Sequence, residues 1–237
     1  SSPEVAVLPW GATEAHNFHL PYGCDTLQGE SIAAEAARIA WDQGAQVIVL
    51  PALPYGVNTG QKDIRLDMNV NPSTQLCLLK DILSVLNHHE IRKLMLLNSH
   101  GGNDFKPLIR ELGLVFPDMF ICTANWYEAV DLYDFFDTPG DHAGEMETSL
   151  LLYLRPDLVL PRDTWGEGRE KKQRISSFRE KWLWAERRWP DVTADTGIGN
   201  PRRATREKGE RFFKAVTQKI GSVILELCKA DLSDLYE

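Results

Sequence analysis

The sequence predicts an α/β fold in which a mainly parallel sheet lies between two layers of helices. Short, uniformly apolar runs alternate along the chain with longer segments of helical periodicity. Strands without polar alternation are typical of parallel sheets that helices cover on both faces. Polar loops rich in histidine and carboxylate side chains follow three of the apolar runs. The pattern therefore predicts the fold class and also the edge of the sheet at which a site is built.

Four strands and five main helices are expected. The apolar runs at residues 5–9, 47–50, 93–98 and 120–124 are the predicted strands. The first predicted helix begins at Thr26, whose hydroxyl suits a helix cap, and ends before Gly44. The other helices are predicted over residues 72–90, 105–115, 147–154 and 205–229. Residues 155–203 show no periodicity, and no linker divides the chain, so residues 1–237 are predicted to form one domain.

The composition narrows the possible partners and the compartment. The net charge of −8 argues against nucleic acid or an anionic membrane, because both favour a basic surface. No apolar run approaches the roughly 20 residues of a membrane span, and the chain does not open with the basic segment of a secretory signal. The four cysteines form no C-x-x-C pair, and Cys77 and Cys122 are predicted core residues. Free thiols are typical of a reducing compartment, so we expect the protein in the cytoplasm.

Histidine and carboxylate side chains gather in three loops, at residues 10–25, 99–103 and 137–147. The carboxyl ends of parallel strands meet at one edge of a sheet, so these loops are expected to converge. Together they contain Glu14, His16, His19, Asp25, His100, His142, Glu145 and Glu147. The two remaining histidines, His88 and His89, lie at a predicted helix end, where the helix dipole favours a cation.

A mixture of histidine and carboxylate ligands suits divalent ions such as Zn, Mn, Fe or Mg. Two ions about 3.5–4 Å apart lower the pKa of a water between them and polarise a substrate carbonyl. Each residue also has a structural alternative: His100 can cap the helix that follows it, and Glu147 can stabilise a helix N-terminus. The joint occurrence of all these side chains at one edge favours a metal centre.

Three motifs occur in the order that is typical of the creatininase (creatinine amidohydrolase) family. Residues 8–26 read LPWGATEAHNFHLPYGCDT, residues 98–103 read NSHGGN, and residues 142–149 read HAGEMETS. A weaker match, ATREKGE, lies at residues 204–210, so the resemblance spans nearly the whole chain. It implies a three-layer α/β/α sandwich and a dinuclear metal centre that hydrolyses amide C–N bonds.

The resemblance also implies a ligand set. Glu14, Asp25 and His100 would hold one ion, and His16 together with a bridging Asp25 would hold the other. Creatininase itself takes a further carboxylate two places after the second-motif histidine, and this place is Gly102 here, which has no side chain to bind a metal. We expect Glu145 to replace that carboxylate. Glu147 would then be a catalytic residue that orients a ligand or His142, although the reverse assignment of the two glutamates stays open.

The mechanism that the resemblance implies is attack of a metal-bridging hydroxide on an amide or formamide carbonyl. The N–H groups of Gly101 and Gly102 would help to stabilise the oxyanion. His142 matches the substrate-binding histidine of the family and is expected to protonate the leaving nitrogen. Trp126 matches an aromatic residue that covers the pocket, with ordinary packing as the alternative. His19 is expected to order its loop by hydrogen bonding.

The residues expected to contact the substrate depart from the creatininase pattern. Thr138 and Pro139 stand where creatininase has a Trp-Asp pair, and residues 67–73 replace its Pro-Gly-Thr loop. These departures argue against creatinine and leave a small amide, a formamidopyrimidine nucleotide or a peptide as candidate substrates. The family forms hexamers, so a homo-oligomer is expected, with residues 182–189 as an interface or a pocket cover.

Two other classes of function remain possible from the sequence. A phosphate-binding module would place an anion where Gly101 and Gly102 precede a helix, but the chain lacks both G-x-G-x-x-G and the Walker lysine. A thiol amidase would use Cys24 as its nucleophile. Metal content separates the first alternative from a metal enzyme, and a Cys24→Ser variant separates the second.

Overall fold

Four parallel strands form the central sheet, in the order β2-β1-β3-β4. They are β1 (Val5–Trp10), β2 (Val47–Val49), β3 (Lys93–Asn98) and β4 (Phe120–Asn125). The computed structural model describes residues 3–236. Strands β1 and β3 pair over their whole length, from Val5 opposite Lys93 to Trp10 opposite Asn98. The predicted parallel sheet is confirmed, and the strands lie within one residue of their predicted bounds.

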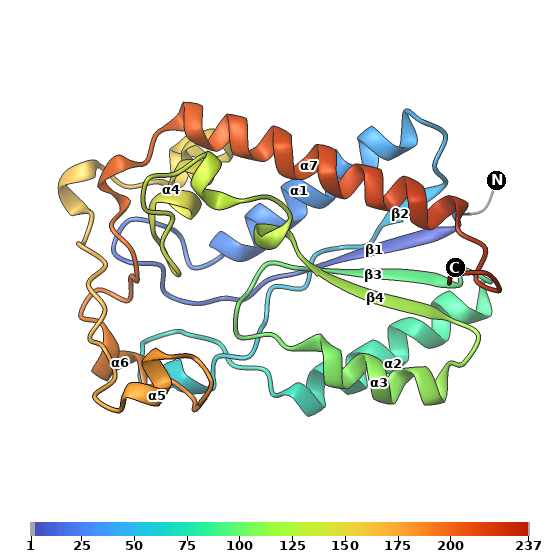
Figure 1. The fold of residues 1–237 in the computed structure, drawn as a ribbon, viewed down its shortest axis with the longest axis horizontal. Helices are drawn as coiled ribbons and strands as arrows, with labels where there is room; N and C mark the ends of the chain where they lie inside the picture. The colour runs from blue at the N-terminus through green and yellow to red at the C-terminus, as the bar shows by residue number, and fades with distance from the viewer. Residues whose placement is uncertain (1–2, 237) are drawn as a thin grey trace.

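Helices cover both faces of this sheet (Figure 1). On one face lie α1 (Cys24–Trp41), α4 (Glu145–Leu154) and α7 (Arg206–Lys229), and on the other lie α2 (Pro72–His88) and α3 (Phe105–Val115). Alternate residues of β1 explain the two layers, because successive side chains of a strand point to opposite faces. Val5 and Val7 pack in a core with Phe212, whereas Ala6 and Leu8 pack in a second core with residues of α2 and α3. The predicted three-layer α/β/α fold is confirmed.

Two local predictions were wrong. Helix α1 begins at Cys24 after Gly23, so Thr26 lies inside its first turn, and the Thr26 hydroxyl donates to the Ala12 carbonyl oxygen. The earlier start places Asp25 in the first turn, where the helix dipole favours a negative charge. Cys77 is exposed, because the core-facing stripe of α2 is carried by Leu79 and other leucines on the opposite face of the helix.

The four thiols are free, as predicted. Cys24 and Cys228 are buried, whereas Cys122 is only partly buried. His88 and His89 lie at the C-terminal end of α2, as the sequence indicated.

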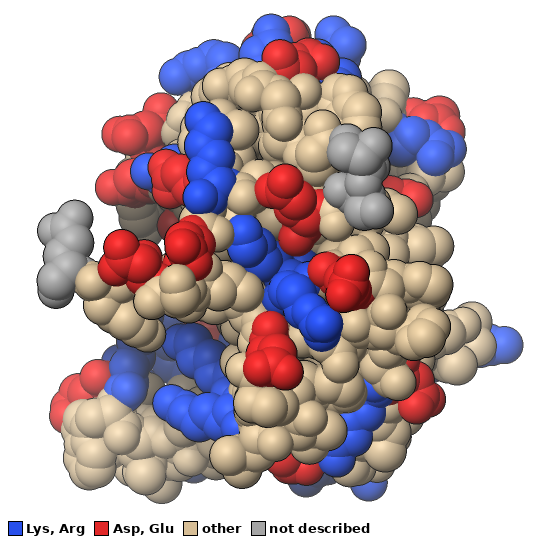
Figure 2. All heavy atoms as spheres, turned by 90° about the vertical axis from the view of Figure 1, so that its right-hand side faces the viewer, with Lys and Arg blue, Asp and Glu red and all other residues tan. Residues whose placement is uncertain are grey.

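The stretch without predicted periodicity contains only short helices. Its two α-helical turns are α5 (Ser176–Arg179) and α6 (Trp189–Val192), separated by irregular backbone. This stretch passes beyond the end of the sheet at which the strands finish, on the left of Figure 1. The opposite end, where both termini lie, carries intermingled acidic and basic side chains (Figure 2). Within residues 3–236, no helix is long and apolar enough to cross a membrane.

Candidate metal centre

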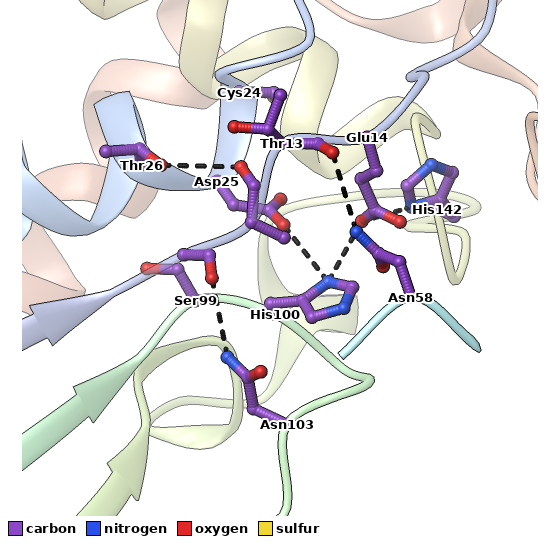
Figure 3. Close-up of polar contacts among 12 residues, drawn as sticks. Thr13, Glu14, Cys24, Asp25, Thr26, Asn58, Ser99, His100, Asn103 and His142 are labelled. Atoms are coloured by element: carbon purple, nitrogen blue, oxygen red, sulfur yellow. Dashed lines mark hydrogen bonds and ion pairs between the residues drawn. The ribbon is translucent and has the colours of Figure 1, made fainter. Parts of the chain in front are cut away.

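Two carboxylates converge on the ring of His100 at the carboxyl edge of the sheet (Figure 3). Nδ1 of His100 lies 2.9 Å from Oε1 of Glu14 and 3.1 Å from Oδ2 of Asp25. Glu14 comes from the loop after β1, Asp25 from the first turn of α1 and His100 from the loop after β3. All three side chains are buried. The loops therefore converge as expected from the parallel sheet.

A second group of side chains lies beside the first. Nε2 of His16 is 3.0 Å from Oδ1 of Asp25 and 3.7 Å from Oε1 of Glu147. The Cys24 sulfur belongs to the same group: it and the ligand atoms of His16 and Glu147 all lie within 4.8 Å of one another. One oxygen of Asp25 faces His16 and the other faces His100, so this carboxylate lies between the two groups. Nδ1 of His142 lies 3.7 Å from Oε1 of Glu14.

Backbone carbonyl groups fix the orientation of all three histidines. Nδ1 of His16 lies 3.0 Å from the carbonyl oxygen of Glu14, and Nε2 of His100 lies 3.0 Å from that of Val57. Nε2 of His142 lies 2.8 Å from the carbonyl oxygen of Ala15. A carbonyl oxygen only accepts, so these nitrogens carry the hydrogen and donate it. In a neutral ring the remaining nitrogen then presents a lone pair, which is how histidines that bind metal ions are held.

This arrangement fits a cation. On His16 and His100 the lone-pair nitrogen faces a carboxylate oxygen about 3 Å away, and two electron-rich atoms repel unless a proton or a metal ion lies between them. Among the described residues, Oδ2 of Asp25 is buried and accepts no well-formed hydrogen bond. Carboxylate, imidazole and thiol donors together match the ligand preferences of Zn and neighbouring divalent metals.

Electrostatics within the cluster point the same way. Burial alone would raise the pKa of Glu14, but the facing histidines, His100 first, hold this pKa well below its ordinary value. Burial alone would lower the pKa of His100, but the carboxylates of Glu14 and Asp25 raise it well above the usual range. The centre therefore keeps Glu14 ionised and favours positive charge beside it.

The structure does not bring Glu145 to this cluster. Its carboxylate accepts a hydrogen bond from the Thr138 N–H at 2.8 Å and pairs with Lys208 of α7. Residues two apart on an α-helix point about 200° away from each other, so Glu145 and Glu147 cannot face one site. The start of α4 at Glu145 turns Glu147 toward His16, which is the reverse of the expected roles.

A cavity of about 900 Å³ opens onto the centre. Glu14, His100 and His142 line it together with Gly101 and Gly102. The otherwise irregular stretch also contributes to the lining, with Trp184, Ala185, Glu186, Arg187 and Trp189. His16, Cys24, Asp25 and Glu147 do not line this cavity, so the second group lies behind the first as seen from the opening.

Gly102 is required by a close approach of the backbone. A Cβ atom at this position would lie 2.2 Å from the Val57 carbonyl oxygen and 2.5 Å from Nε2 of His100. Any side chain here would therefore break the hydrogen bond that orients His100. The close approach of the Val57 carbonyl therefore explains both why position 102 carries no carboxylate and how His100 is held.

Trp126 and His19 lie outside the cavity. Trp126 is buried in the core, where its Nε1 donates to the Ser99 hydroxyl at 2.7 Å and its ring packs against Phe212. This is the packing alternative that the sequence left open. Nε2 of His19 lies 2.9 Å from the Thr148 hydroxyl, and its ring stacks on Trp165.

The contacts of three further residues at the site could not be predicted, although the sequence indicated residues 182–189 as an interface or a pocket cover. The amide of Gln61 donates to Oε2 of Glu14, and the ring of Trp189 packs edge-on against His142, with ring centroids 4.9 Å apart. Arg187 lies over Trp189 and pairs with Asp141 at 2.7 Å. None of these belongs to a motif, because each reaches the site through a contact between distant parts of the chain.

The fold and the cluster together define an α/β protein with a metal-capable histidine–carboxylate centre at the carboxyl edge of a parallel sheet. The sequence model of the creatininase family, described as creatinine amidohydrolase, matches residues 1–224. The chain belongs to the creatininase family and is a hydrolase. The family, the fold and the hydrolase class predicted from the sequence are therefore confirmed.

Solved structures support this assignment. The structure of a candidate creatinine amidohydrolase from Bacteroides fragilis NCTC 9343 is 41% identical, superimposes with a TM-score of 0.94, and covers 100% of this chain and 93% of that chain. A mutant creatininase of Zn-Zn type and a manganese creatininase are each 25% identical, with TM-scores of 0.73 and 0.74. In both cases the match covers 94% of this chain and 90% of that chain.

Characterised relatives act on different substrates. The creatinine amidohydrolase of Pseudomonas putida is 28% identical over 245 residues, covering 94% of this chain and 89% of the relative. The mycofactocin precursor peptide peptidase of Mycobacterium tuberculosis is 28% identical over 228 residues, covering 91% of this chain and 82% of the relative. Similarity to these proteins thus leaves the substrate open between a small amide and a peptide.

Proposed function

We propose that this protein is a metal-dependent amidohydrolase that cleaves the C–N bond of an amide or formamide. The observation that carries the proposal is the position of Asp25, whose two oxygens face His16 and His100 at 3.0 and 3.1 Å. A carboxylate between two such groups is suited to sharing two divalent ions. When bound, two such ions supply an activated water and polarise a substrate carbonyl.

The proposed ligands follow from the two groups. Glu14, Asp25 and His100 would hold the ion nearer the cavity, and His16, Asp25 and Glu147 would hold the second ion. Glu147 takes the role first expected of Glu145, which is the reverse assignment that the sequence left open, because Glu145 is engaged by Lys208. The imidazole and carboxylate donors suit Zn, Mn or Fe, and the relatives of known structure include Zn and Mn forms.

Other residues would bind and protonate the substrate. The N–H groups of Gly101 and Gly102 border the cavity and are proposed to donate to the developing oxyanion. His142 lines the cavity, held by the Ala15 carbonyl, and its Nδ1 is proposed to accept a proton from the attacking water and to pass it to the leaving nitrogen. Trp189 rather than Trp126 would cover the substrate, because it lines the cavity and packs on His142.

The size of the cavity favours a substrate larger than creatinine. Its volume of about 900 Å³ is near the upper end of the range for pockets that bind drug-sized molecules. A peptide amide, as in the mycobacterial relative, or a formamidopyrimidine nucleotide would use more of this space than creatinine does. A peptidase-like activity is therefore the second candidate within the same reaction class.

The alternatives from other classes are less consistent with the site. A phosphate at Gly101 would meet the buried carboxylate of Glu14, which lines the same cavity, and like charges repel. Burial raises the pKa of the Cys24 thiol well above its ordinary value, which disfavours the thiolate that a thiol amidase needs.

Assembly and compartment remain part of the proposal. We propose a homo-oligomer in the cytoplasm, as the family resemblance implies. The exposed rings of Trp182 and Trp184, 70% and 81% accessible, are the apolar surface that supports association. Sedimentation of the purified protein tests this part.

Metal analysis and a substrate panel test the proposed function. We expect the purified protein to bind two ions per chain and, with Zn, Mn or Fe supplied, to hydrolyse formamides, cyclic ureides or short peptides faster than creatinine. His100→Ala should lose metal and, with the loss of about 4 kcal/mol of transition-state stabilisation, roughly a thousandfold in kcat/KM. Full activity and full metal content in His100→Ala would disprove the proposed centre.

A further inference from the structure

Cys24 is placed where it would touch a metal ion rather than only fill space. It is the first residue of α1, fully buried, and directly precedes Asp25. Its sulfur lies within 4.8 Å of ligand atoms of His16 and Glu147, and those two atoms are 3.7 Å apart. Around a tetrahedral zinc ion with bonds of about 2.0–2.3 Å, neighbouring ligand atoms are separated by roughly 3.3–3.8 Å. The three groups therefore need only a small contraction to share one ion.

A single amide holds both ends of this group. Nε2 of Gln28, a buried residue one turn further along α1, donates to the Cys24 sulfur at 3.3 Å and to the Glu147 carbonyl oxygen at 3.2 Å. These bonds tie the thiol at the start of α1 to the backbone of α4 at Glu147. The buried Asp25 carboxylate borders the same position, since its Oδ1 lies 3.0 Å from Nε2 of His16, while its Oδ2 faces His100.

We propose that Cys24 is a ligand of the second ion, so that the two metal positions differ in their preference for metals. This inference rests on the proposed function. The position nearer the cavity has two carboxylates and one imidazole, whereas the inner one has imidazole, thiolate and two carboxylates. Thiolate is a soft ligand that favours Zn over Mn or Mg, and the thiol proton passes to water as the ion binds.

The two metal positions also differ in whether their ligands line the cavity. Four protein ligands, His16, Cys24, Asp25 and Glu147, would hold the inner ion more completely than three hold the outer one, and the water shared by the two ions would be its fifth ligand. None of these four lines the cavity, whereas Glu14 and His100 do. The inner position thus keeps its zinc, while the outer position takes Zn, Mn or Fe and exposes its ion to the substrate.

Cobalt substitution of the full chain tests the proposal. Co(II) bound to a thiolate has a near-ultraviolet charge-transfer band that oxygen and nitrogen ligands do not give. We expect this band in the wild type and in Cys228→Ser, a matched buried thiol on α7. Cys24→Ser should lose the band and bind zinc at least tenfold more weakly at one of its two positions. In competition it should take up manganese there.

Two outcomes would overturn the proposal. One is a Cys24→Ser protein that keeps the charge-transfer band and its zinc, and the other is a zinc-loaded wild type whose X-ray absorption shows no sulfur at about 2.3 Å. The second measurement needs no variant, so it decides the matter if Cys24→Ser does not fold. If the wild type bound no ions at all, the proposed function would fail. Two bound ions without sulfur would remove only this inference.

Discussion

The metal centre and the wall that covers it are built in opposite ways. The centre is buried, and backbone carbonyls orient its histidines: His16 is 0% and Glu14 1% exposed. The cover, residues 182–192, is mostly exposed, with Trp184 at 81%, and its contacts include the ion pair of Arg187 with Asp141 and the packing of Trp189 on His142. Exposed ion pairs contribute little, at most about 1 kcal/mol. The molecule thus separates a buried, tightly oriented centre from a more exposed cover, which we expect to act on substrate selection.

One segment joins the two regions. In residues 57–61, the Val57 carbonyl accepts from His100, and the Gln61 amide donates to Glu14. Gly60, between them, lies against the backbone of the cover at Arg187. Changes in the cover are therefore expected to alter substrate binding without moving the proposed metal ligands, provided that the contacts of residues 57–61 stay intact.

The largest contrast is expected between two glutamates of one helix turn. Glu147→Gln should lose the second ion and roughly a thousandfold in kcat/KM, because an amide is a poor metal ligand and about 4 kcal/mol of stabilisation disappears. Glu145→Gln should keep both ions and lose about 1–3 kcal/mol of unfolding free energy, because its buried pair with Lys208 is weakened. Metal analysis and urea titration of both variants measure this. The opposite pattern would return Glu145 to the metal.

A smaller effect, on the pH dependence of stability, is expected at His19, whose ring stacks on Trp165 in the segment that precedes the cover. Burial, with a contribution from His16, lowers the pKa of His19 from 6.5 to about 4. The unfolded chain therefore binds this proton at higher pH than the folded chain. The His19 contribution to stability is complete above pH 6.5 and is lost as the pH falls toward 4, by up to about 3 kcal/mol.

His19→Asn isolates this effect. Its unfolding free energy should fall less between pH 6.5 and 4 than that of the wild type, although it starts lower because the stacking on Trp165 is lost. Urea titrations at several pH values measure the two slopes. Equal slopes would show that His19 is not the acid-sensitive contact.

The smallest effect is expected in the cover. In Gly60→Ala the new Cβ would lie 2.0 Å from the Arg187 carbonyl oxygen. The cover must therefore shift, which we expect to cost about 1–3 kcal/mol of unfolding free energy. We expect about a tenfold lower kcat/KM, with unchanged metal content. Gly113→Ala is the matched control, because nothing lies within 4 Å of its Cβ. The control should keep full activity and gain about 0.5–1 kcal/mol of stability. Loss of metal in Gly60→Ala would mean that the two regions are not separable.

The metal centre and the cover also differ in how far the sequence could predict them. The strands, the helices and the cluster around Glu14, Asp25 and His100 follow from periodicity and from local motifs. The roles of Glu145 and Glu147 depend on where α4 begins, and a shift of two residues turns a side chain about 200° around the helix. Such boundaries are the least certain part of any prediction from sequence.

Residues 182–189 are predicted as an interface or a pocket cover, but the contacts that hold them could not be predicted, because they are tertiary contacts. Trp189 reaches His142 across 47 positions of sequence, and Gln61 reaches Glu14 across the same number. Neither contact leaves a periodic or local signal. For Trp126 the sequence left a pocket role and core packing open, and its side chain lies in the core.

The pairing of β1 with β3 makes the metal centre a test of correct folding. Trp10 lies opposite Asn98, and the proposed ligands Glu14 and His100 come four and two positions after these residues. A slip by one position displaces one strand by about 3.3 Å and turns its side chains to the wrong face. Metal bonds tolerate only about 0.2 Å. If the centre holds ions as proposed, only chains whose strands are in register should bind them, and slipped chains would stay unprotected against proteases.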